Sequence, residues 1–574
     1  MNDSIAMYFA KLLGKVGIKR IWGITGDSLN GLSDSLKKLG EIEWIGTRHE
    51  ETAAFAAGAD AKVSGKIAVC AGSSGPGNLH LINGLFDCQR KGVPVLAIAS
   101  HIPSSEIGSG YFQETHPQEL FKECSVFCEL VTNPEQMPHI LETAIRQAIL
   151  KKGVSVIVIP GDTMLAPMPE TSKLLWNEPN LPKVLPDEGD IIELAKILNE
   201  NEKVTFMCGA GCIDSHDEVV KLAHLLNAPV VHALGGKEYI EGNNPNSVGM
   251  TGLIGYESGY YAMENSDVLL ILGSAFPYKA FYPEDAKIVQ IDIKPEALGR
   301  HTQIDLGMVG DIKSSLEMLI PRINKKDNNS FLKSALKHYK TTVENFDKLA
   351  SGNSKVGLVH PQYLTKLIDK YASDDAIFTC DVGTPTVWAA RYLHMNGKRK
   401  LIGSFNHGSM ASALPQAIGA KVSCPNKEVI ALCGDGGFAM LMGDFLTLLQ
   451  HKIKAKIVIY NNSSLGFVAI EMKAGGYLYD NTELENPDFS AIAKAVGVKG
   501  FRVEEPDELE STVKEFLEYD GAALLDVTTA KQELTMPPKI SFENAKGFGI
   551  YMVRAIINGK GDELIEVAKD NILR

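Results

Sequence analysis

The stretch of sequence that decides the fold reads Val429-Ile430-Ala431-Leu432-Cys433-Gly434-Asp435-Gly436-Gly437. An apolar run that stops at a glycine turn is typical of a buried parallel strand feeding a helix. A second apolar run, Lys456-Ile457-Val458-Ile459-Tyr460, ends in Asn461-Asn462. Ligands of parallel α/β sheets bind beyond the carboxyl ends of the strands, so we expect both motifs to face one site.

These two strand ends carry the groups that a diphosphate and its cation require. Backbone N–H groups at a glycine turn and a helix start face anions, whereas Asp carboxylate and Asn amide oxygens suit Mg²⁺. A lone Gly-Asp-Gly-Gly is more often an ordinary turn. Its pairing with a second strand ending in Asn-Asn indicates a diphosphate clamp, with Asp435 and Asn462 as the Mg²⁺ ligands.

Apolar runs of the same kind alternate with helical stretches along the whole chain. They include 20–24, 43–45, 66–70, 93–98, 154–159, 204–208, 228–231, 268–272 and 288–292. Segments 66–98 and 428–460 share one rhythm of strand, turn, helix and strand, which implies two domains of one architecture separated by a third. We therefore predict an α/β fold with three doubly wound parallel-sheet domains at 1–182, 183–334 and 335–530, followed by an amphipathic tail at 531–574.

Composition excludes several function classes. The 574 residues carry a formal net charge of −13, and no basic stretch stands out, which argues against nucleic acid as a partner. The nine cysteines never form Cys-x-x-Cys, so reduced thiols in the cytoplasm are expected. No apolar run is long enough to span a bilayer, and the start of the chain lacks the basic region of a signal peptide.

With these runs and the clamp, nearly the whole chain resembles the thiamine diphosphate- and flavin-dependent branch of the pyruvate oxidase and acetohydroxyacid synthase family. The resemblance implies thiamine diphosphate, Mg²⁺ and FAD as cofactors, held by pyrimidine-binding, FAD-binding and diphosphate-binding domains in chain order. It implies that the Ser464 carbonyl completes the Mg²⁺ ligands. The residues it places at the diphosphate are Gly434, Asp435, Gly436, Gly437, Asn462, Ser464, Leu465 and Gly466.

The resemblance also assigns an acid to Arg48-His49-Glu50-Glu51. By position in the family pattern, Glu50 shares a proton with the cofactor's aminopyrimidine, and the apolar run Ala53–Ala57 would keep that proton available. On its own, this tetrapeptide at a helix start is more often a charge pairing with the helix dipole. In the family this Glu and the clamp come from different subunits, which implies a homo-oligomer of at least two chains and suggests a tetramer.

Two further motifs match the family around the reacting carbon. Gly408-Ser409-Met410 would place Met410 beneath the cofactor, although such a Met is otherwise a core gap-filler. Phe112 and Gln113 match a Phe-Gln pair of the substrate pocket. Phe467 and Glu471 follow the clamp four residues apart, where pyruvate oxidases place residues over the substrate. Acetohydroxyacid synthases carry Gln-Trp in place of Ile470-Glu471, which weakens a carboligase reading.

The middle domain and the tail complete the resemblance. The segments that match flavin-contacting loops are Thr251, Gly252, Leu253, Ile254, Ser274, Ala275, Phe276, Pro277, Tyr278 and Asp292. Beyond residue 547, apolar residues recur at helical spacing with basic neighbours, which fits a helix in a membrane interface and fits docking on the protein's own core equally well. Resemblance of this tail to the lipid-activated, quinone-reducing members favours docking on a phospholipid bilayer at the inner face of the cell membrane, with Asn558-Gly559-Lys560-Gly561 separating two short helices.

The resemblance implies oxidative decarboxylation of pyruvate to acetate and CO₂, with electrons passing through FAD to a membrane quinone. Three alternatives remain open. They are a phosphate-dependent oxidase that makes acetyl phosphate and hydrogen peroxide, a carboligase that makes acetolactate, and a non-catalytic membrane-binding relative.

Overall fold

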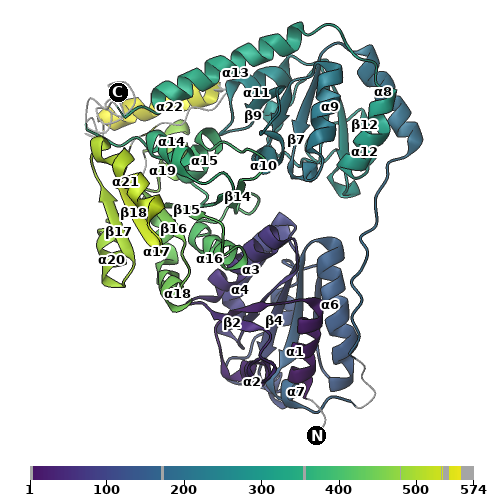
Figure 1. The fold of residues 1–574 in the computed structure, drawn as a ribbon, viewed down its shortest axis with the longest axis vertical. Coiled ribbons are helices and arrows are strands. Elements are labelled where there is room, and N and C mark those ends of the chain that lie inside the picture. Colours follow the sequence, from purple (N-terminus) through teal and green to yellow (C-terminus); the bar gives the residue numbers. More distant parts are fainter. Residues whose placement is uncertain are drawn as a thin grey trace.

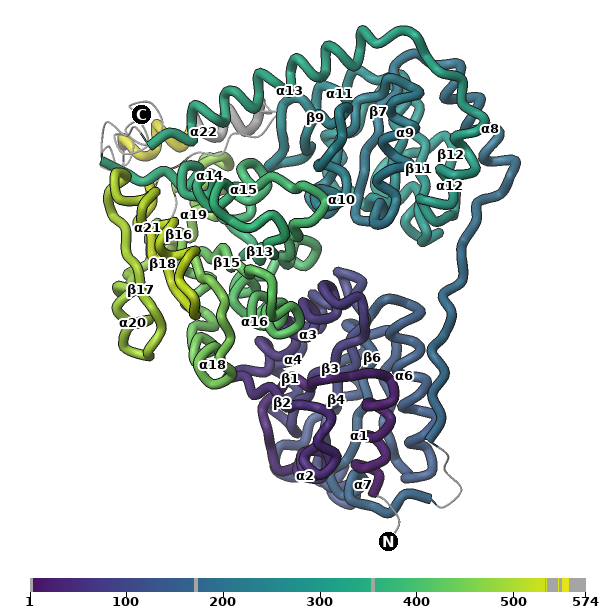
Figure 2. The backbone as a smooth tube through the Cα atoms, viewed as in Figure 1, coloured from purple at the N-terminus to yellow at the C-terminus, as the bar shows by residue number. Residues whose placement is uncertain are grey.

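The computed structural model describes residues 4–169, 174–352, 357–478, 480–531, 533 and 542–557. The described chain forms three six-stranded sheets with helices packed around each of them (Figure 1). Every pairing between neighbouring strands is parallel, as in β3 with β4, β10 with β11 and β15 with β16. The predicted α/β class with three parallel-sheet domains is therefore confirmed. Figure 2 traces the chain from the first sheet through a long connection to the second and then to the third.

The first sheet has the strand order β2-β1-β3-β4-β6-β5. Its strands are β1 (Arg20–Gly23), β2 (Glu43–Gly46), β3 (Ala68–Gly72), β4 (Val95–His101), β5 (Phe127–Leu130) and β6 (Val154–Pro160). Its helices are α1 (Ile5–Val16), α2 (Asn30–Leu39), α3 (Glu50–Ser64), α4 (Pro76–Lys91), α5 (Pro117–Leu120), α6 (Met137–Lys151) and α7 (Gly161–Leu165).

The middle sheet has the order β12-β11-β10-β7-β8-β9. Its strands are β7 (Val204–Cys208), β8 (Val230–His232), β9 (Ser247–Met250), β10 (Val268–Leu272), β11 (Lys287–Asp292) and β12 (Leu306–Val309). Its helices are α8 (Glu188–Glu200), α9 (His216–Leu226), α10 (Lys237–Ile240), α11 (Glu257–Glu264) and α12 (Ile312–Leu319), and the long α13 (Ser330–Leu349) leads to the third sheet.

The third sheet has the order β14-β13-β15-β16-β18-β17, which is the order of the first sheet when strands are counted within each domain. Its strands are β13 (Ile377–Cys380), β14 (Lys400–Gly403), β15 (Val429–Gly434), β16 (Lys456–Asn461), β17 (Lys499–Val503) and β18 (Ala523–Thr528). Its helices are α14 (Pro361–Tyr371), α15 (Thr384–Tyr392), α16 (Ala413–Ser423), α17 (Asp435–Met440), α18 (Phe445–Gln450), α19 (Gly466–Ala474), α20 (Phe489–Ala495) and α21 (Pro506–Glu518), and α22 (Phe542–Ile557) follows.

Each sheet is buried on both faces because successive side chains along a strand point to opposite sides. Val69 and Cys70 of β3 belong to different core clusters, as do Ala431 and Leu432 of β15. This double burial explains why the strands read as continuous apolar runs. It also leaves the carboxyl ends of the strands, where the strand order switches direction, as the edge at which a ligand can bind.

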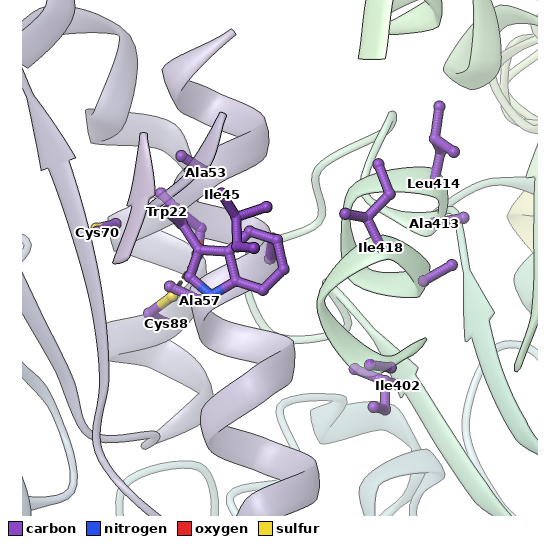
Figure 3. Close-up of a cluster of buried hydrophobic side chains, with 14 of the residues drawn as sticks. Trp22, Ile45, Ala53, Ala57, Cys70, Cys88, Ile402, Ala413, Leu414 and Ile418 are labelled. Carbon is purple, nitrogen blue, oxygen red and sulfur yellow. Dashed lines mark hydrogen bonds between the residues drawn. The ribbon is translucent and has the colours of Figure 1, made fainter. Parts of the chain in front are cut away.

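The first and third domains share one core. A cluster that contains Trp22, Ala57 and Cys70 of the first domain continues into Ile402 and Ile418 of the third (Figure 3). Helix α3 lies against α16 at this junction. The start of α3 is therefore held in a fixed position relative to the third domain.

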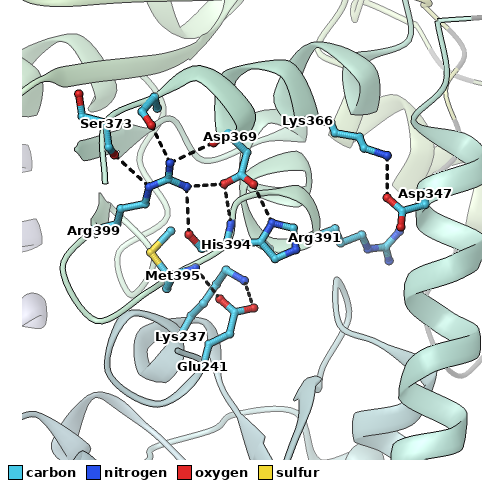
Figure 4. A network of polar contacts seen from close by, with 12 residues as sticks. Lys237, Glu241, Asp347, Lys366, Asp369, Ser373, Arg391, His394, Met395 and Arg399 are labelled. Atoms are coloured by element: carbon cyan, nitrogen blue, oxygen red, sulfur yellow. Dashed lines mark hydrogen bonds and ion pairs between the residues drawn. The ribbon is translucent and has the colours of Figure 1, made fainter. Parts of the chain in front are cut away.

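Hydrogen bonds join the middle domain to the third (Figure 4). The ammonium of Lys237 on α10 donates to the Glu241 carboxylate at 2.7 Å, and the second oxygen of Glu241 accepts the Met395 backbone N–H at 3.0 Å. Nearby, Arg399 donates to Asp369 at 2.7 Å. Because Lys237 is fully buried, this pairing is required to compensate its charge.

In the described part of the chain, no helix combines the length and apolarity needed to cross a membrane. The cysteines are free thiols, and Cys128 and Cys424 are half-buried while the other seven are buried.

Candidate active site

The Asp435 carboxylate lies at the start of α17, directly after β15, and is 3% exposed. Its oxygens accept the Gly436 backbone N–H and the Asn486 side-chain amide, each at 2.8 Å. Burial raises the pKa of Asp435, and the backbone N–H groups of Ser463 and Ser464 approach the same carboxylate and act in the opposite direction. The ends of β15 and β16 therefore meet at Asp435, as the sequence predicts.

Met410 lies beside the same turn. A β-carbon at Gly436 would lie 3.0 Å from Leu465 Cδ2 and 3.4 Å from Met410 Cε, so both side chains lie against this turn. The Asn462 side-chain oxygen accepts the Ser464 backbone N–H at 3.1 Å. The structure thus gathers the predicted diphosphate residues and Met410 around one turn.

Two polar residues of this turn carry no motif in the sequence. Asn486 donates from one amide nitrogen to both Asp435 and Asn461, at 2.8 and 3.0 Å, and so links the ends of β15 and β16. Asp381 follows β13 and accepts the backbone N–H groups of Ala413 at 2.8 Å and Gly434 at 3.2 Å. Its position after a strand-like run was a usable signal, whereas Asn486 lies in a loop without one.

Asp381 makes stability depend on pH. Burial raises the pKa of Asp381 to about 7, above the value of about 3.9 in an unfolded chain. Native protein therefore binds more protons than unfolded protein between these values, and this contribution to stability is lost as pH rises from about 4 to about 7. Asp381→Asn removes the titration but presents an N–H₂ group to a buried N–H, which costs about 1–3 kcal/mol.

We expect the melting temperature of Asp381→Asn to lie below that of the wild type, with a gap that narrows as pH rises toward neutrality. Scanning calorimetry from pH 5 to pH 7.5 measures this gap. Asp374→Asn, an exposed residue just before β13, is the matched control. A gap that widens with pH would contradict the assignment.

Glu50 is the first residue of α3 and is 6% exposed. Its Oε2 lies 2.9 Å from His80 Nδ1, and the His80 ring stacks on His49 with centroids 4.4 Å apart. A β-carbon at Gly77 would lie 3.1 Å from Glu50 Oε1. His80 therefore contacts the predicted acid Glu50. No sequence motif indicates this contact.

Within the described residues, His49, Glu50 and His80 could also hold a metal ion, since their ligand atoms lie within 4.8 Å of one another. This nitrogen-rich set suits zinc, whereas the oxygen atoms near Asp435 suit Mg²⁺.

Helix α4 connects this acid to the loop of Met410. The Asn83 side-chain amide donates to Glu51 at 2.7 Å and to Ser409 Oγ at 2.9 Å. Gly408 of the same loop is exposed. The Asn83 side chain therefore links the first domain, through Glu51, to the Met410 loop of the third domain.

The two residues of the predicted Phe-Gln pair point in different directions. Phe112 is 78% exposed, whereas Gln113 is half-buried and its Oε1 accepts from Ser74 Oγ at 3.0 Å. Ser74 belongs to the turn between β3 and α4, and Gly77 is the second residue of α4. The structure therefore places Gln113, and not Phe112, beside the turn that leads into α4, whose Gly77 lies next to Glu50.

Helix α19 carries Phe467 and Glu471. Phe467 is half-buried against the core of the third domain, and Glu471 is exposed. Tyr278 of the middle domain has its pKa raised by burial and, secondarily, by the Glu471 carboxylate. The charge of the predicted substrate residue Glu471 therefore acts on Tyr278 of a predicted flavin loop.

The other predicted flavin segments cluster at the carboxyl ends of the middle strands. A β-carbon at Gly252 would lie 3.0 Å from the Phe276 ring, so the loops 251–254 and 274–278 pack together. Asp292 ends β11, and burial raises its pKa. Among the described residues, Thr251 Oγ1 and His232 Nε2 are buried without a hydrogen-bond partner. Such atoms fit a polar ligand at this edge.

The last described helix packs on α19. Tyr551 and Ala555 of α22 are fully buried in a cluster with Ala469, and Arg554 donates to the Gly476 carbonyl at 2.7 Å. The exposed face of α22 carries Ile550, Met552, Val553 and Ile556. The predicted break at 558–561 and the second short helix lie outside the described residues.

The three parallel sheets and the clamp define a protein that binds a diphosphate-bearing cofactor, and comparison with known proteins identifies the family. Models of the thiamine pyrophosphate enzyme domains match it in order: the N-terminal TPP binding domain at 3–120, the central domain at 191–319 and the C-terminal TPP binding domain at 381–527. The chain belongs to the thiamine pyrophosphate enzyme family, and thiamine diphosphate is its cofactor.

Full-length relatives agree with this assignment. The chain is 35% identical over 563 residues to the putative thiamine pyrophosphate-containing protein YdaP of Bacillus subtilis (strain 168), covering 97% of each chain. It is 31% identical over 562 residues to the probable acetolactate synthase large subunit of Methanococcus aeolicus, covering 92% of each. It is 29% identical over 509 residues to the pyruvate oxidase of Lactiplantibacillus plantarum, covering 87% of this chain and 84% of that one.

Proposed function

We propose that this enzyme oxidatively decarboxylates pyruvate. Pyruvate, water and an oxidised quinone give acetate, CO₂ and the reduced quinone, with FAD carrying the two electrons between substrate and quinone. The electrostatic effect of Glu471 on Tyr278 supports this proposal, because the two residues belong to the helix expected over the substrate and to a loop expected to hold the flavin. A carboligase has no need of electron transfer between these two positions.

The cofactors supply the chemistry that side chains lack: thiamine diphosphate provides a nucleophile and an electron sink, and FAD accepts two electrons. Glu50 holds a proton for the aminopyrimidine ring, in a position shielded from water. Gln113 offers its amide to the oxygens of the 2-oxo acid. Phe467 and Glu471 cover the reacting carbon, Phe467 by excluding water and Glu471 by polar contact.

The cofactor sites follow from the same contacts. Asp435, Asn462 and the Ser464 carbonyl would ligate Mg²⁺, whose charge offsets the diphosphate and the buried carboxylate. FAD would lie along the carboxyl ends of the middle strands. Thr251 Oγ1 and His232 Nε2 are buried there and have no hydrogen-bond partner among the described residues.

A second copy of the chain would complete the site. Large apolar side chains are exposed on the helices that carry its two halves: Leu79 on α4 is 43% exposed, Met440 on α17 is 61% exposed and Val468 on α19 is 45% exposed. A second copy packed on these helices would cover the exposed apolar side chains. We therefore propose a homo-oligomer in which Glu50 of one chain acts on cofactor clamped by another.

Anaerobic reduction of the flavin by pyruvate tests the proposed function. Bleaching of the flavin absorbance, reversed by a quinone in lipid vesicles, is the expected result. Acetolactate formation without bleaching would establish a carboligase instead. Bleaching that requires phosphate, with acetyl phosphate and hydrogen peroxide as products in air, would establish a phosphate-dependent oxidase.

The tail would regulate this reaction. Because α22 packs on α19, the helix that carries Phe467 and Glu471 is restrained while α22 is docked. The exposed apolar face of α22 would enter a bilayer and draw α22 away from α19. A restraint that holds 99% of molecules closed requires only about 2.7 kcal/mol, comparable to burying one large side chain.

Two substitutions separate docking from membrane binding. Tyr551→Ala removes a fully buried ring and should raise the lipid-free rate of dye reduction about tenfold while vesicle flotation persists. Ile556→Ser changes a side chain that is 64% exposed, and should weaken flotation without raising the lipid-free rate. Deleting the chain from Tyr551 onward should both raise the lipid-free rate and weaken vesicle flotation. If the deletion leaves flotation and lipid-free rate unchanged, the tail serves packing alone.

A further inference from the structure

The turn between β3 and α4 and the first turn of α4 lie against two predicted site residues of the first domain, Gln113 and Glu50. A β-carbon at Gly75 would lie 2.9 Å from Gln113 Cβ, and one at Gly77 would lie 3.1 Å from Glu50 Oε1. Between these glycines and the end of β3 lies Ser74, which is 3% exposed and donates to Gln113 Oε1 at 3.0 Å. We propose that Ser74 is a positioning residue that fixes the amide orientation of Gln113, and this inference rests on the proposed function.

The argument for orientation is chemical. A glutamine amide has an accepting oxygen and a donating nitrogen on opposite sides, and either can face a ligand. Because the Ser74 hydroxyl donates to Oε1, the Nε2 group turns away from Ser74 and presents its N–H bonds. Pyruvate offers only oxygen acceptors in its carboxylate and carbonyl groups. The serine therefore selects the amide orientation that suits a 2-oxo acid.

Ser74 is itself held in place. Its backbone N–H donates to Ser28 Oγ at 3.1 Å, and Ser100 Oγ donates to the Ser28 carbonyl at 2.8 Å. These residues lie at the carboxyl ends of β3 and β4 and on the segment after β1. The short side chain of Ser74 therefore starts from a backbone that hydrogen bonds hold at the sheet edge.

The backbone of Gln113 is constrained from the other side. Its φ of 64° is unusual for a residue other than glycine, and such strain is kept where surrounding contacts enforce it. The Glu114 backbone N–H donates to the Tyr111 carbonyl at 2.9 Å, and the Glu114 carboxylate accepts the backbone N–H groups of Gly108 and of Gly110, the latter at 2.7 Å. This turn directs Phe112 to solvent and Gln113 back toward Ser74.

Steady-state kinetics of the flavin-loaded enzyme with pyruvate test the proposal. Ser74→Ala should raise KM about 2- to 10-fold, the cost of one lost hydrogen bond, with a smaller change in kcat. Ser74→Thr keeps the hydroxyl and should restore KM. Ser104→Ala is the matched control. Ser104 lies in the segment between β4 and α5 that also contains Gln113, and its hydroxyl donates to Asp162 at 2.5 Å.

A double-mutant cycle excludes a merely structural role. If Ser74 acts through Gln113, Ser74→Ala should have no further effect on KM once Gln113→Ala is present. An undiminished effect in that background, or a Ser74→Ala KM equal to that of the wild type, would overturn the inference while leaving pyruvate turnover intact. Absence of pyruvate turnover by the wild-type enzyme would instead overturn the proposed function and the substrate assignment made here.

Discussion

Glu50→Gln is expected to lower kcat about 10²- to 10⁴-fold while thiamine diphosphate remains bound, because general acid–base catalysis contributes a factor of this size. Glutamine keeps the shape of the Glu50 side chain, which is 6% exposed. It can also retain the contact with His80 Nδ1, which lies 2.9 Å from Glu50 Oε2 in the wild type. It removes only the exchangeable carboxyl proton. Binding of the cofactor is proposed to depend on the diphosphate clamp of the third domain, which the change does not touch.

The measurement is single-turnover and steady-state kinetics with pyruvate, together with the cofactor content of the purified variant. Glu51→Gln is the matched control, since Glu51 lies in the same helical turn and pairs with Asn83 at 2.7 Å. Turnover of Glu50→Gln near the wild-type rate, or equal losses in both variants, would show that Glu50 is not the acid.

Asp435→Ala is expected to abolish activity at ordinary cofactor concentrations. The substitution removes a carboxylate that is proposed to ligate Mg²⁺ and that collects N–H groups from Gly436, Ser463 and Ser464. Without the metal, the charge of the diphosphate lacks compensation. Activity should recover in part at high thiamine diphosphate and Mg²⁺, because ligand excess offsets a weakened site by mass action.

Calorimetric titration of thiamine diphosphate into the apoenzyme measures this effect directly. Asp480→Ala, an exposed Asp of the same domain, is the control and should bind cofactor as the wild type does. Unchanged cofactor affinity in Asp435→Ala would mean that the clamp lies elsewhere.

Mixing the two inactive variants tests whether sites are shared between chains. In a dimer with shared sites, a hybrid of Glu50→Gln and Asp435→Ala has one site with both changes and one intact site. Random reassociation should therefore restore roughly a quarter of the wild-type activity. If each chain builds its own site, no activity returns.

The sequence by itself determines the layered architecture and predicts the clamp. Strands buried on both faces must be continuously apolar, so runs such as 429–433 and 456–460 show their positions within one or two residues. The run at 66–70 shows the limit of this accuracy, since β3 begins at Ala68 and ends at Gly72. Chemistry that depends on strand ends, as at Asp435 and Asn462, follows from the same pattern because the fold brings those ends to one edge.

Only the tertiary structure decides which side chains from distant segments complete the site. His80 reaches Glu50 from the next helix, Asn486 reaches Asp435 across 51 residues, and Asp381 reaches Gly434 across 53. No local pattern encodes these meetings, because they depend on the packing of elements that are separate in sequence. The same holds for the tail, whose periodicity fits a bilayer and a protein core alike. Packing alone assigned Tyr551 to α19 and left Ile556 in solvent, since the apolar stripe of a helix does not specify its partner.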